Sequence, residues 1–593
     1  MNDKDSKKWN LDDVLPMSQF DNFYQEIERN IEEIDKWWNK LGPEMEKKDF
    51  GELIEFTENL GEKITRIVDL PYLMEAADEK DKTAKLLKTK ANDLAIKCQE
   101  KTRKINHWLR GLEVEGKKRL DDKNAKRLFA AITDLEYGLS RMREAAKHTL
   151  SQKEENVVTN KDVNGIETLK DLREIIEAEF EYELKIEGKE IRVIKTQSEL
   201  LALTHSVDKE ERKAAYEALL KKQKDNLDKL FLVYQAAVKD WGYEAKIRGF
   251  KSPITVRNFA NDIEDKAVET MMAVCQEKKE IFLKYFEWKA KKLGVKKLTR
   301  FDLYAPIETK TNQVMSYEKA KELVLSTLDE FSADFKRLAE KVIEEKHVDV
   351  EPRVNKRSGA FCATIGPKIT PYILLNHTGT IRDVYTLAHE LGHAVHSLLA
   401  NKHWPSVQQA NLPLAETAST LAEMVLFEKI LEKEKDKKTK TAMVSQKIDD
   451  TYATTLRQIY FVLFEMRAHE EIKKGITDEG LAKIWLEMLS EQLGKSVEVD
   501  PLFAYEWGYV SHIVESPFYC YAYAFGELLT ISLYGRYKKE GKGFLPKIEK
   551  LLAAGGSKSP NTILKEAGVN INQRAFWEEG FGIIENWIKL LDN

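Results

Sequence analysis

The chain has 593 residues, of which 42% are hydrophobic and 33% are charged, and its formal net charge is −5 at pH 7. This length allows a large core and more than one domain. So slight a net charge for this size gives no indication of binding to nucleic acid or to an anionic membrane, and we expect neither among its partners.

Three features of the sequence predict a cytoplasmic protein. The four cysteines include no C-x-x-C pair, which favours a reducing compartment. The first eight residues are polar, so no signal peptide is visible. No apolar run reaches the length that would span a membrane.

The first third of the chain is expected to be helical. Residues 1–180 show successive long amphipathic patterns. Residues 182–186 and 191–194 then alternate like the strands of a hairpin. A helical pattern reopens at Thr196, and there we place the boundary between an N-terminal helical domain, residues 1–195, and a catalytic domain, residues 196–593. The fold class predicted is all-α, predominantly helical, with a few short strands near the active site.

Two short strands are predicted within residues 357–364 and 371–376, on either side of Gly366 and Pro367. The edge of such a sheet could bind an extended peptide by strand addition, through main-chain hydrogen bonds that ignore side-chain identity. A purely structural hairpin explains the same pattern equally well.

The most informative motif lies in the segment that follows. Apolar positions at helical spacing predict a buried amphipathic helix, with Thr380 as its N-cap. Within it, His389-Glu390-Leu-Gly-His393 forms an H-E-x-x-H pattern, which places both imidazoles on one face, where they can bind one ion. Glu390 can then take a proton from a metal-bound water. Two hydrogen-bonded core histidines and a solvated glutamate are the alternative, but burying these groups is costly unless they are paired or bind a metal.

A catalytic zinc site needs a third protein ligand besides the two histidines. The extended motif with a third histidine is absent, because Leu399 stands where that histidine would be. A carboxylate from the next helix is the other source. Glu416 lies just after the helix-starting Pro413 and is our predicted ligand, and Glu423, two turns on, is its rival and a candidate for orienting a ligand. A helix-terminal carboxylate without a metal is the other interpretation of Glu416.

Taken together, these motifs resemble those of the M3 family of zinc metallopeptidases, in particular its oligoendopeptidase F branch. The similarity runs from the Trp9-Asn-Leu-Asp-Asp13 opening to the C-terminus and is densest after residue 355. The segments that carry it include Ser358–Cys362, Pro371–Asn376, His389–His393, Ala415–Ser419, Pro517–Tyr523 and Ala554–Pro560. The resemblance implies a clamshell-like helical fold with one zinc ion per chain deep in a channel, and oligopeptides as substrates.

A histidine and tyrosine cluster near the C-terminus is the second candidate part of the site. By the resemblance, Tyr523 matches a tyrosine facing the reaction centre and His512 a histidine that stabilises the transition state, while Tyr519 competes for one of two tyrosine roles. Hydroxyl and imidazole donors suit the oxyanion formed in amide hydrolysis. The alternative is an aromatic helix that only packs. His396 shares the metal-facing side of its helix; it could orient Glu416 or contact the substrate, and we expect an orienting or packing role rather than a catalytic one.

The sequence thus predicts a zinc-dependent endopeptidase for short peptides, with His389, His393 and Glu416 as ligands and Glu390 as general base. A zinc carboxypeptidase or dipeptidyl carboxypeptidase on a similar frame is the related alternative. A non-catalytic peptide-binding protein is the alternative from another class, against which the intact Glu390 speaks. Ala554–Ser559 lacks the glycines of a phosphate loop and is expected to connect two helices. The oligomeric state stays open.

Overall fold

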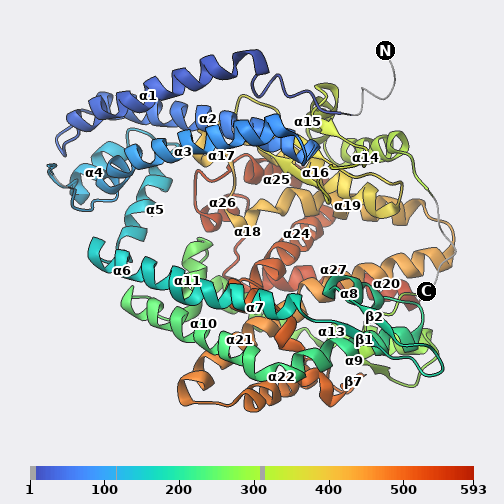
Figure 1. Cartoon of the computed structure of the whole chain (residues 1–593). Helices are drawn as coiled ribbons and strands as arrows, with labels where there is room; N and C mark the ends of the chain where they lie inside the picture. Colours follow the sequence, from blue (N-terminus) through green and yellow to red (C-terminus); the bar gives the residue numbers. More distant parts are fainter. Residues whose placement is uncertain (1–7, 115, 308–313, 593) are drawn as a thin grey trace. The chain divides into compact units, whose positions relative to one another are not determined.

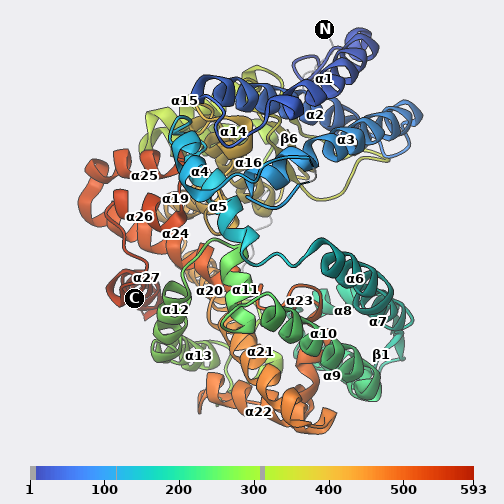
Figure 2. The same ribbon diagram turned by 90° about the vertical axis from the view of Figure 1, so that its left-hand side faces the viewer.

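The computed structural model describes residues 8–114, 116–307 and 314–592. Within them the chain forms two compact units, each drawn from segments far apart in the sequence (Figures 1 and 2). The first unit comprises Met1–Lys147, Asn312–Glu432 and Arg536–Val569, and the second comprises His148–Thr311, Lys433–Gly535 and Asn570–Asn593. The predicted boundary at residue 196 stays a prediction, because compactness alone does not show which segments fold by themselves.

In its described residues, the N-terminal part of the first unit contains five α-helices, and each of them buries one face. In α1, Ile27, Ile31 and Ile34 recur every three or four residues and are buried, as expected of an amphipathic helix. The N-cap of α3, Asp81, accepts the backbone N–H groups of Thr83 and Ala84. The bounds are α1 (Phe20–Lys40), α2 (Lys47–Ala77), α3 (Lys82–Leu109), α4 (Asp122–Phe129) and α5 (Glu136–Ala146).

The rest of the first unit surrounds the helix α16, Ile381–Leu399, which packs against α14, α15, α25 and a three-stranded sheet. In this sheet β6 lies between β4, which runs parallel to it, and β5, which runs antiparallel. The other bounds are α14 (Tyr317–Phe331), α15 (Ala333–Glu344), β4 (Val348–Asp349), β5 (Phe361–Ala363), β6 (Tyr372–Leu374), α17 (Pro405–Gln408), α18 (Leu412–Ala415), α19 (Thr417–Lys433), α25 (Leu545–Leu552) and α26 (Pro560–Glu566).

The second unit is helical as well, and it contains the predicted hairpin. Strands β1 and β2 pair antiparallel, with Tyr182 opposite Ile194. The bounds are α6 (Gln152–Asp162), α7 (Thr168–Ala178), β1 (Tyr182–Leu184), β2 (Arg192–Ile194), α8 (Gln197–Leu203), α9 (Lys209–Asp225), α10 (Leu227–Ile247), α11 (Pro253–Ala260), α12 (Asp265–Glu277), α13 (Glu280–Lys292), β3 (Leu298–Thr299), α20 (Lys437–Thr454), α21 (Leu456–Lys474), α22 (Asp478–Leu493), β7 (Val497–Glu498), α23 (His512–Glu515), α24 (Tyr521–Glu540) and α27 (Arg574–Asp592).

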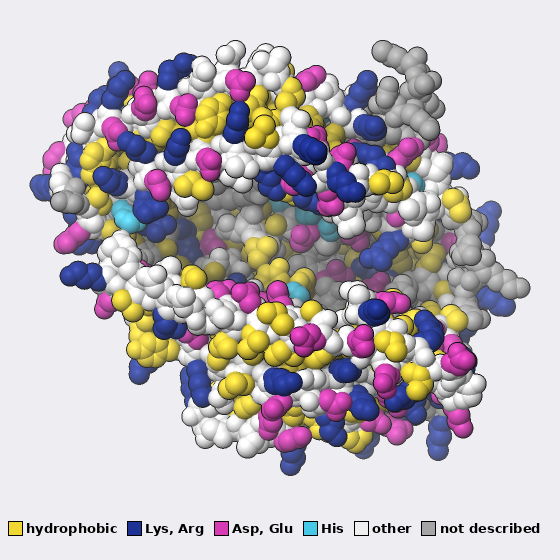
Figure 3. All heavy atoms as spheres, in the orientation of Figure 1, with side chains coloured by type: hydrophobic (Ala, Val, Ile, Leu, Met, Phe, Trp, Pro, Cys, Tyr) yellow, Lys and Arg dark blue, Asp and Glu magenta, His cyan; other side chains and the backbone are white. Residues whose placement is uncertain are grey.

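The predicted fold class is confirmed: the described residues are mostly helical, and the strands are few and short. Both predicted strands around Gly366 exist as β5 and β6, and residues 554–559 connect α25 to α26 as expected. The clamshell with a deep channel concerns how the two units are placed, and it stays a prediction. Among the described helices, none is both long and apolar enough to cross a bilayer. On the face drawn in Figure 3, basic and acidic side chains are interspersed, in keeping with the small net charge.

Candidate metal centre

The helix α16 begins at a strongly capped N-terminus. The Thr380 hydroxyl accepts the N–H of Asp383, and the Asp383 carboxylate accepts the N–H of Thr380, forming a capping box. The same carboxylate oxygen also accepts the N–H groups of Thr378 and Gly379, each at 2.9 Å. These bonds, together with a nearly continuous set of buried apolar residues, fix where the helix starts and how it is rotated. The predicted N-cap is therefore confirmed.

A glycine allows the neighbouring helix to approach α16 very closely. A Cβ atom added at Gly392 would lie 2.6 Å from the Cα of Ser419 and 2.7 Å from the carbonyl oxygen of Ala418. No residue with a side chain fits there without moving a backbone. The contact places the start of α19 directly beside the two motif histidines, and this brings Glu416 within reach of them.

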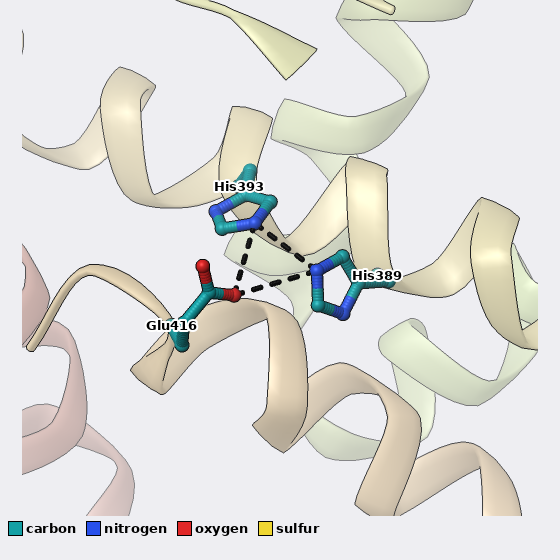
Figure 4. A group of neighbouring side chains, drawn as sticks. All are labelled: His389, His393 and Glu416. Carbon is teal, nitrogen blue, oxygen red and sulfur yellow. Dashed lines mark hydrogen bonds and ion pairs between the residues drawn. The ribbon is translucent and has the colours of Figure 1, made fainter. Parts of the chain in front are cut away.

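The structure brings His389, His393 and Glu416 together (Figure 4). The two Nε2 atoms are 3.2 Å apart, and the Oε2 atom of Glu416 lies 3.4 Å from Nε2 of His389 and 3.2 Å from Nε2 of His393. A tetrahedral zinc ion with bonds of about 2.0–2.1 Å holds its ligand atoms about 3.3 Å from one another. The three donor atoms thus have the chemistry and the spacing of a zinc site.

Glu416 occupies a joint between two helices, where the sequence predicted one continuous helix. The short helix α18 starts at Leu412 with Pro413 near its N-terminus, as expected, but it ends at Ala415, and α19 begins at Thr417. Glu416 lies between them with φ −87° and ψ −1°. Its side chain is fixed locally, because the Ser419 hydroxyl donates to the Oε2 atom at 2.9 Å.

The rival carboxylate, Glu423, binds the opposite side of the first histidine. Its Oε1 atom accepts a hydrogen bond of 2.5 Å from Nδ1 of His389. A proton on Nδ1 leaves the lone pair on Nε2, the atom that faces Glu416 and His393. The arrangement therefore favours Glu416 as the ligand and Glu423 as the group that orients His389, although the ligand set stays a prediction.

The carboxylates of Glu416 and Glu423 stabilise positive charge at this site. Burial disfavours a charged imidazole, but hydrogen bonds to Glu416 and Glu423 outweigh it and raise the pKa of His389 to about 10. Burial would also raise the pKa of Glu416, yet the two histidines hold it far below its usual range. A group of side chains that favours a proton so strongly also favours a divalent cation in the same place.

Glu390 lies in a cavity of about 400 Å³ beside these residues. Its side chain is buried, and the burial raises its pKa even though His389 and His393 act in the opposite direction. Residues of β5, α16 and the segment 408–415 line the cavity: Ala360, Phe361, Cys362, Thr364, His389, Glu390, His393, His396, Ser397, Gln408, Gln409, Ala410 and Ala415. The cavity is thus lined both by a carboxylate with a raised pKa and by the two candidate histidine ligands.

His396 belongs to the same cavity without touching the three donor atoms. It is buried, which lowers its pKa to about 4, so its ring is neutral at ordinary pH. The ring forms a hydrogen bond with the backbone of Ala415, the residue before Glu416. His396 therefore ties α16 to the joint that carries Glu416, and this agrees with the expected orienting or packing role.

The predicted cluster of His512, Tyr519 and Tyr523 is found in the second unit. The hydroxyl of Tyr523 lies 3.1 Å from Nε2 of His512, whose ring stacks on Tyr519 at 5.7 Å. Tyr523 is 39% exposed, and burial of its remainder beside Tyr519 raises its pKa to about 12. Tyr521 points elsewhere, as the spacing predicted, and its hydroxyl accepts a hydrogen bond from Asn261. The prediction that the cluster faces the metal concerns both units and stays a prediction.

Sequence reasoning missed one wall of the cavity, formed by residues 408–410. These residues are held from behind by a glycine pair at the connection between α25 and α26. The N–H of Gly556 donates to the carbonyl of Val407, and a Cβ atom at Gly555 would lie 2.5 Å from the carbonyl oxygen of Gln408. The only signal was the pair of adjacent glycines, which the sequence does not connect to residues so far away.

Comparison with known proteins identifies the same family from a family model and from individual relatives. The model of peptidase family M3 matches residues 202–583. An oligoendopeptidase F homolog of Borreliella burgdorferi is 28% identical to this chain, and the match covers 95% of this chain and 89% of that protein. The oligopeptidase PepF of Bacillus subtilis is 23% identical, with 95% of this chain and 83% of that protein covered.

Solved structures have the same fold. A chain of Chlamydophila abortus that is described as a peptidase matches with a TM-score of 0.88 and 21% identity, covering 99% of this chain and 98% of that one. The oligoendopeptidase-F of Enterococcus faecium matches with a TM-score of 0.67 and 22% identity, covering 97% of this chain and 98% of that one. At such identities these matches support the helical fold alone.

Proposed function

Because this chain belongs to peptidase family M3 and is a metalloendopeptidase, we propose that it uses one zinc ion to hydrolyse internal bonds of oligopeptides. The observation that carries the zinc assignment is the spacing of 3.2–3.4 Å among the donor atoms of His389, His393 and Glu416. The relatives from Borreliella burgdorferi and Bacillus subtilis are named an oligoendopeptidase F homolog and an oligopeptidase, and these names support oligopeptides as the substrates.

The proposed chemistry divides the work between the ion and Glu390. Bound zinc supplies a Lewis acid that activates water and polarises the scissile carbonyl. Glu390 accepts the proton of the attacking water and later delivers it to the leaving amine nitrogen. Its place in the same cavity as His389 and His393 supports this role, because proton transfer requires hydrogen-bond reach. Glu423 keeps His389 in the tautomer that binds metal.

Tyr523, Tyr519 and His512 are proposed to stabilise the oxyanion and to hold the substrate. If the N–H on Nε2 of His512 donates to the Tyr523 oxygen, the hydroxyl proton of Tyr523 is available to a substrate carbonyl. The raised pKa of Tyr523, about 12, keeps that proton in place at neutral pH. The partly exposed position of Tyr523 supports access by a ligand.

Two further assignments complete the proposal. We place the protein in the cytoplasm, which the four unpaired cysteines support. We also retain residues 1–195 and 196–593 as the domains, because the family match starts at residue 202. Nucleic acid and membranes are not proposed as partners, and the oligomeric state is left open.

Metal analysis combined with peptide cleavage tests the proposal. We expect about one zinc ion per chain, cleavage of an internally quenched peptide that stops when a chelator is added, and recovery when zinc is returned. Mass spectrometry of a peptide library of graded lengths should show cuts at internal bonds and exclusion of large substrates. Release of only C-terminal residues or dipeptides would instead identify a carboxypeptidase. Zinc binding without any cleavage would identify a peptide-binding relative.

A further inference from the structure

One wall of the cavity that contains Glu390 packs against residues near the start of the sequence. Strand β5 supplies Phe361 and Cys362 to this wall. β5 is a three-residue edge strand that pairs with β6 on one side only. So short an edge strand is held by few hydrogen bonds, and its position must depend on what packs behind it.

An aromatic group from another part of the chain packs behind β5. The ring of Trp9 lies 6.3 Å from that of Phe361 and 6.0 Å from that of Tyr372 in β6, in an edge-on arrangement with the latter. Tyr72 of α2 contacts Phe361 from another direction, at 5.7 Å. Phe361 therefore belongs at once to the cavity wall and to this aromatic group.

Polar contacts fix the same segment to the sheet. The N–H of Asn10 donates to the carbonyl of Lys346 at 3.0 Å, and the Tyr372 hydroxyl donates to the carbonyl of Asn10 at 2.9 Å. Asp13 lies 3.1 Å from Nε2 of His347, a buried ring stacked on Tyr372 at 3.9 Å. In Figure 1 this segment runs beside α15 before α1 begins.

The far end of the segment is anchored to α2. Val14 and Leu15 are buried, and the Val14 carbonyl accepts a hydrogen bond of 2.9 Å from Nε of Arg66. The segment is thus held at both ends, between the sheet and the N-terminal helices. It also lies outside residues 202–583, where the family match is found.

We propose that residues Trp9–Asp13, the N-terminal brace, are positioning residues for the catalytic cavity, which they shape by holding β5 and β6 in place. The proposal rests on the proposed function, because it assigns the brace an effect on peptide cleavage. Trp9 acts through Phe361, and Asp13 acts through His347 and Tyr372. A displacement of about 1 Å in a substrate-binding wall can change a rate by up to about a hundredfold.

A second metal site is the competing explanation for Asp13, Glu345 and His347, whose ligand atoms lie within 4.8 Å of one another. His347 is already held by two protein groups, because its Nδ1 atom lies 2.9 Å from the carbonyl of Thr370 and its Nε2 atom lies 3.1 Å from Asp13. Asp13 and Glu345 are exposed carboxylates, and exposed acidic groups commonly gather without a metal ion. We therefore favour the brace, and the zinc content of Asp13→Asn decides between the two explanations.

The test uses the full chain with Trp9→Ala, Trp9→Phe and Asp13→Asn. In Trp9→Ala we expect kcat/KM for the quenched peptide to fall about ten- to a hundredfold with zinc content unchanged. Hydrogen exchange at the amides of residues 361–363 should become faster. Trp9→Phe keeps an aromatic ring and should recover most of the activity. Asp13→Asn removes the charge of an exposed carboxylate and should reduce kcat/KM less than Trp9→Ala.

Trp37→Ala is the matched control. Trp37 is also partly buried in the N-terminal core, but its ring contacts Phe56 of α2 and not the sheet. This variant loses a similar amount of packing, so it should unfold more readily while its kcat/KM and the exchange of β5 stay at wild-type values. If Trp9→Ala behaves like Trp37→Ala in both measurements, the brace only stabilises the fold and the proposal is wrong.

Two outcomes separate this proposal from the others. If the wild-type chain cleaves no peptide, the proposed function fails. Amide hydrogen exchange of residues 361–363 in Trp9→Ala then still decides whether the brace keeps β5 in place. A second zinc ion per chain that is lost in Asp13→Asn would overturn the brace at Asp13 and assign a metal site there.

Discussion

The two halves that we propose for the active site, one in each compact unit, are built in different ways. At the metal centre, α16 and α19 are in backbone contact at Gly392, and two of the candidate ligands are fixed by neighbours, His389 by Glu423 and Glu416 by Ser419. The cluster of His512, Tyr519 and Tyr523 instead spans α23, the turn after it and the start of α24, with Tyr523 39% exposed. The first half is preorganised and the second can adapt.

This difference suits the two tasks that we propose. A metal ion requires ligand atoms within a few tenths of an ångström of their ideal positions, which only closely packed elements provide. A peptide varies in sequence, and groups that grip its backbone benefit from some freedom. Even so, the adaptable half is anchored: Phe518, next to Tyr519, has φ +60° and donates its N–H to the buried carboxylate of Glu465 at 2.7 Å.

The largest expected effect is that of Glu390→Gln. This change keeps the size of the side chain and removes the general base, so kcat should fall by about 10³–10⁴-fold. Zinc content, measured by elemental analysis, should stay at wild-type level, because Glu390 is not one of the three converging groups. Full activity in this variant would exclude the mechanism.

The next comparison is between Glu416→Gln and Glu423→Gln. Loss of a direct ligand should weaken zinc binding by more than about a hundredfold, whereas loss of the group that orients His389 should weaken it by about 10–100-fold. Competition with a chelator of known affinity measures both. The reverse order would reassign the third ligand to Glu423.

In the adaptable half, Tyr523→Phe should lower kcat about a hundredfold with zinc binding unchanged, because it removes one oxyanion donor. Tyr521→Phe is the matched control, since its hydroxyl bonds with Asn261 in the interior and should affect stability alone. Equal kcat losses in the two variants would show that Tyr523 has no special role in the reaction.

The smallest expected effect is on stability, and it comes from the same change, glycine to alanine, made once in each half. Gly392→Ala places a Cβ 2.6 Å from a backbone atom and should destabilise the fold by about 1–3 kcal/mol. Gly526→Ala, in α24 after the tyrosine cluster, meets no atom within 4 Å and should be neutral or stabilising by up to about 1 kcal/mol. Thermal unfolding with zinc bound measures the pair, and similar Tm shifts would contradict the close packing.

The sequence predicted those parts of the site that depend on local spacing. The histidines of α16 share a face because they are four apart, and Thr380 caps the helix because it stands three residues before Asp383. The pattern also indicated Glu416, which lies beside both histidines and whose role as a ligand stays a prediction, but it did not indicate the joint that Glu416 occupies. That joint depends on the contact between Gly392 and Ser419, which belongs to tertiary packing.

Features that join distant segments could not be predicted in this way. The wall at residues 408–410 is supported by Gly555 and Gly556, and the strand β5 is supported by Trp9. Neither contact leaves a periodic signal, because each depends on which surfaces meet after the chain has folded. The Trp9 opening was recognised only as part of the family resemblance, with no role attached.

The joint at Glu416 has a consequence for the choice of metal. The spacing of the two histidines is fixed by the pitch of α16, and Glu416 is held at the joint by the Ser419 hydroxyl and by the close approach of the two helices at Gly392. We therefore expect cobalt(II), whose radius is close to that of zinc, to enter the site without rearrangement of the ligands. The visible absorption of bound cobalt would then report on the coordination number of a site whose proposed ion, zinc, is colourless.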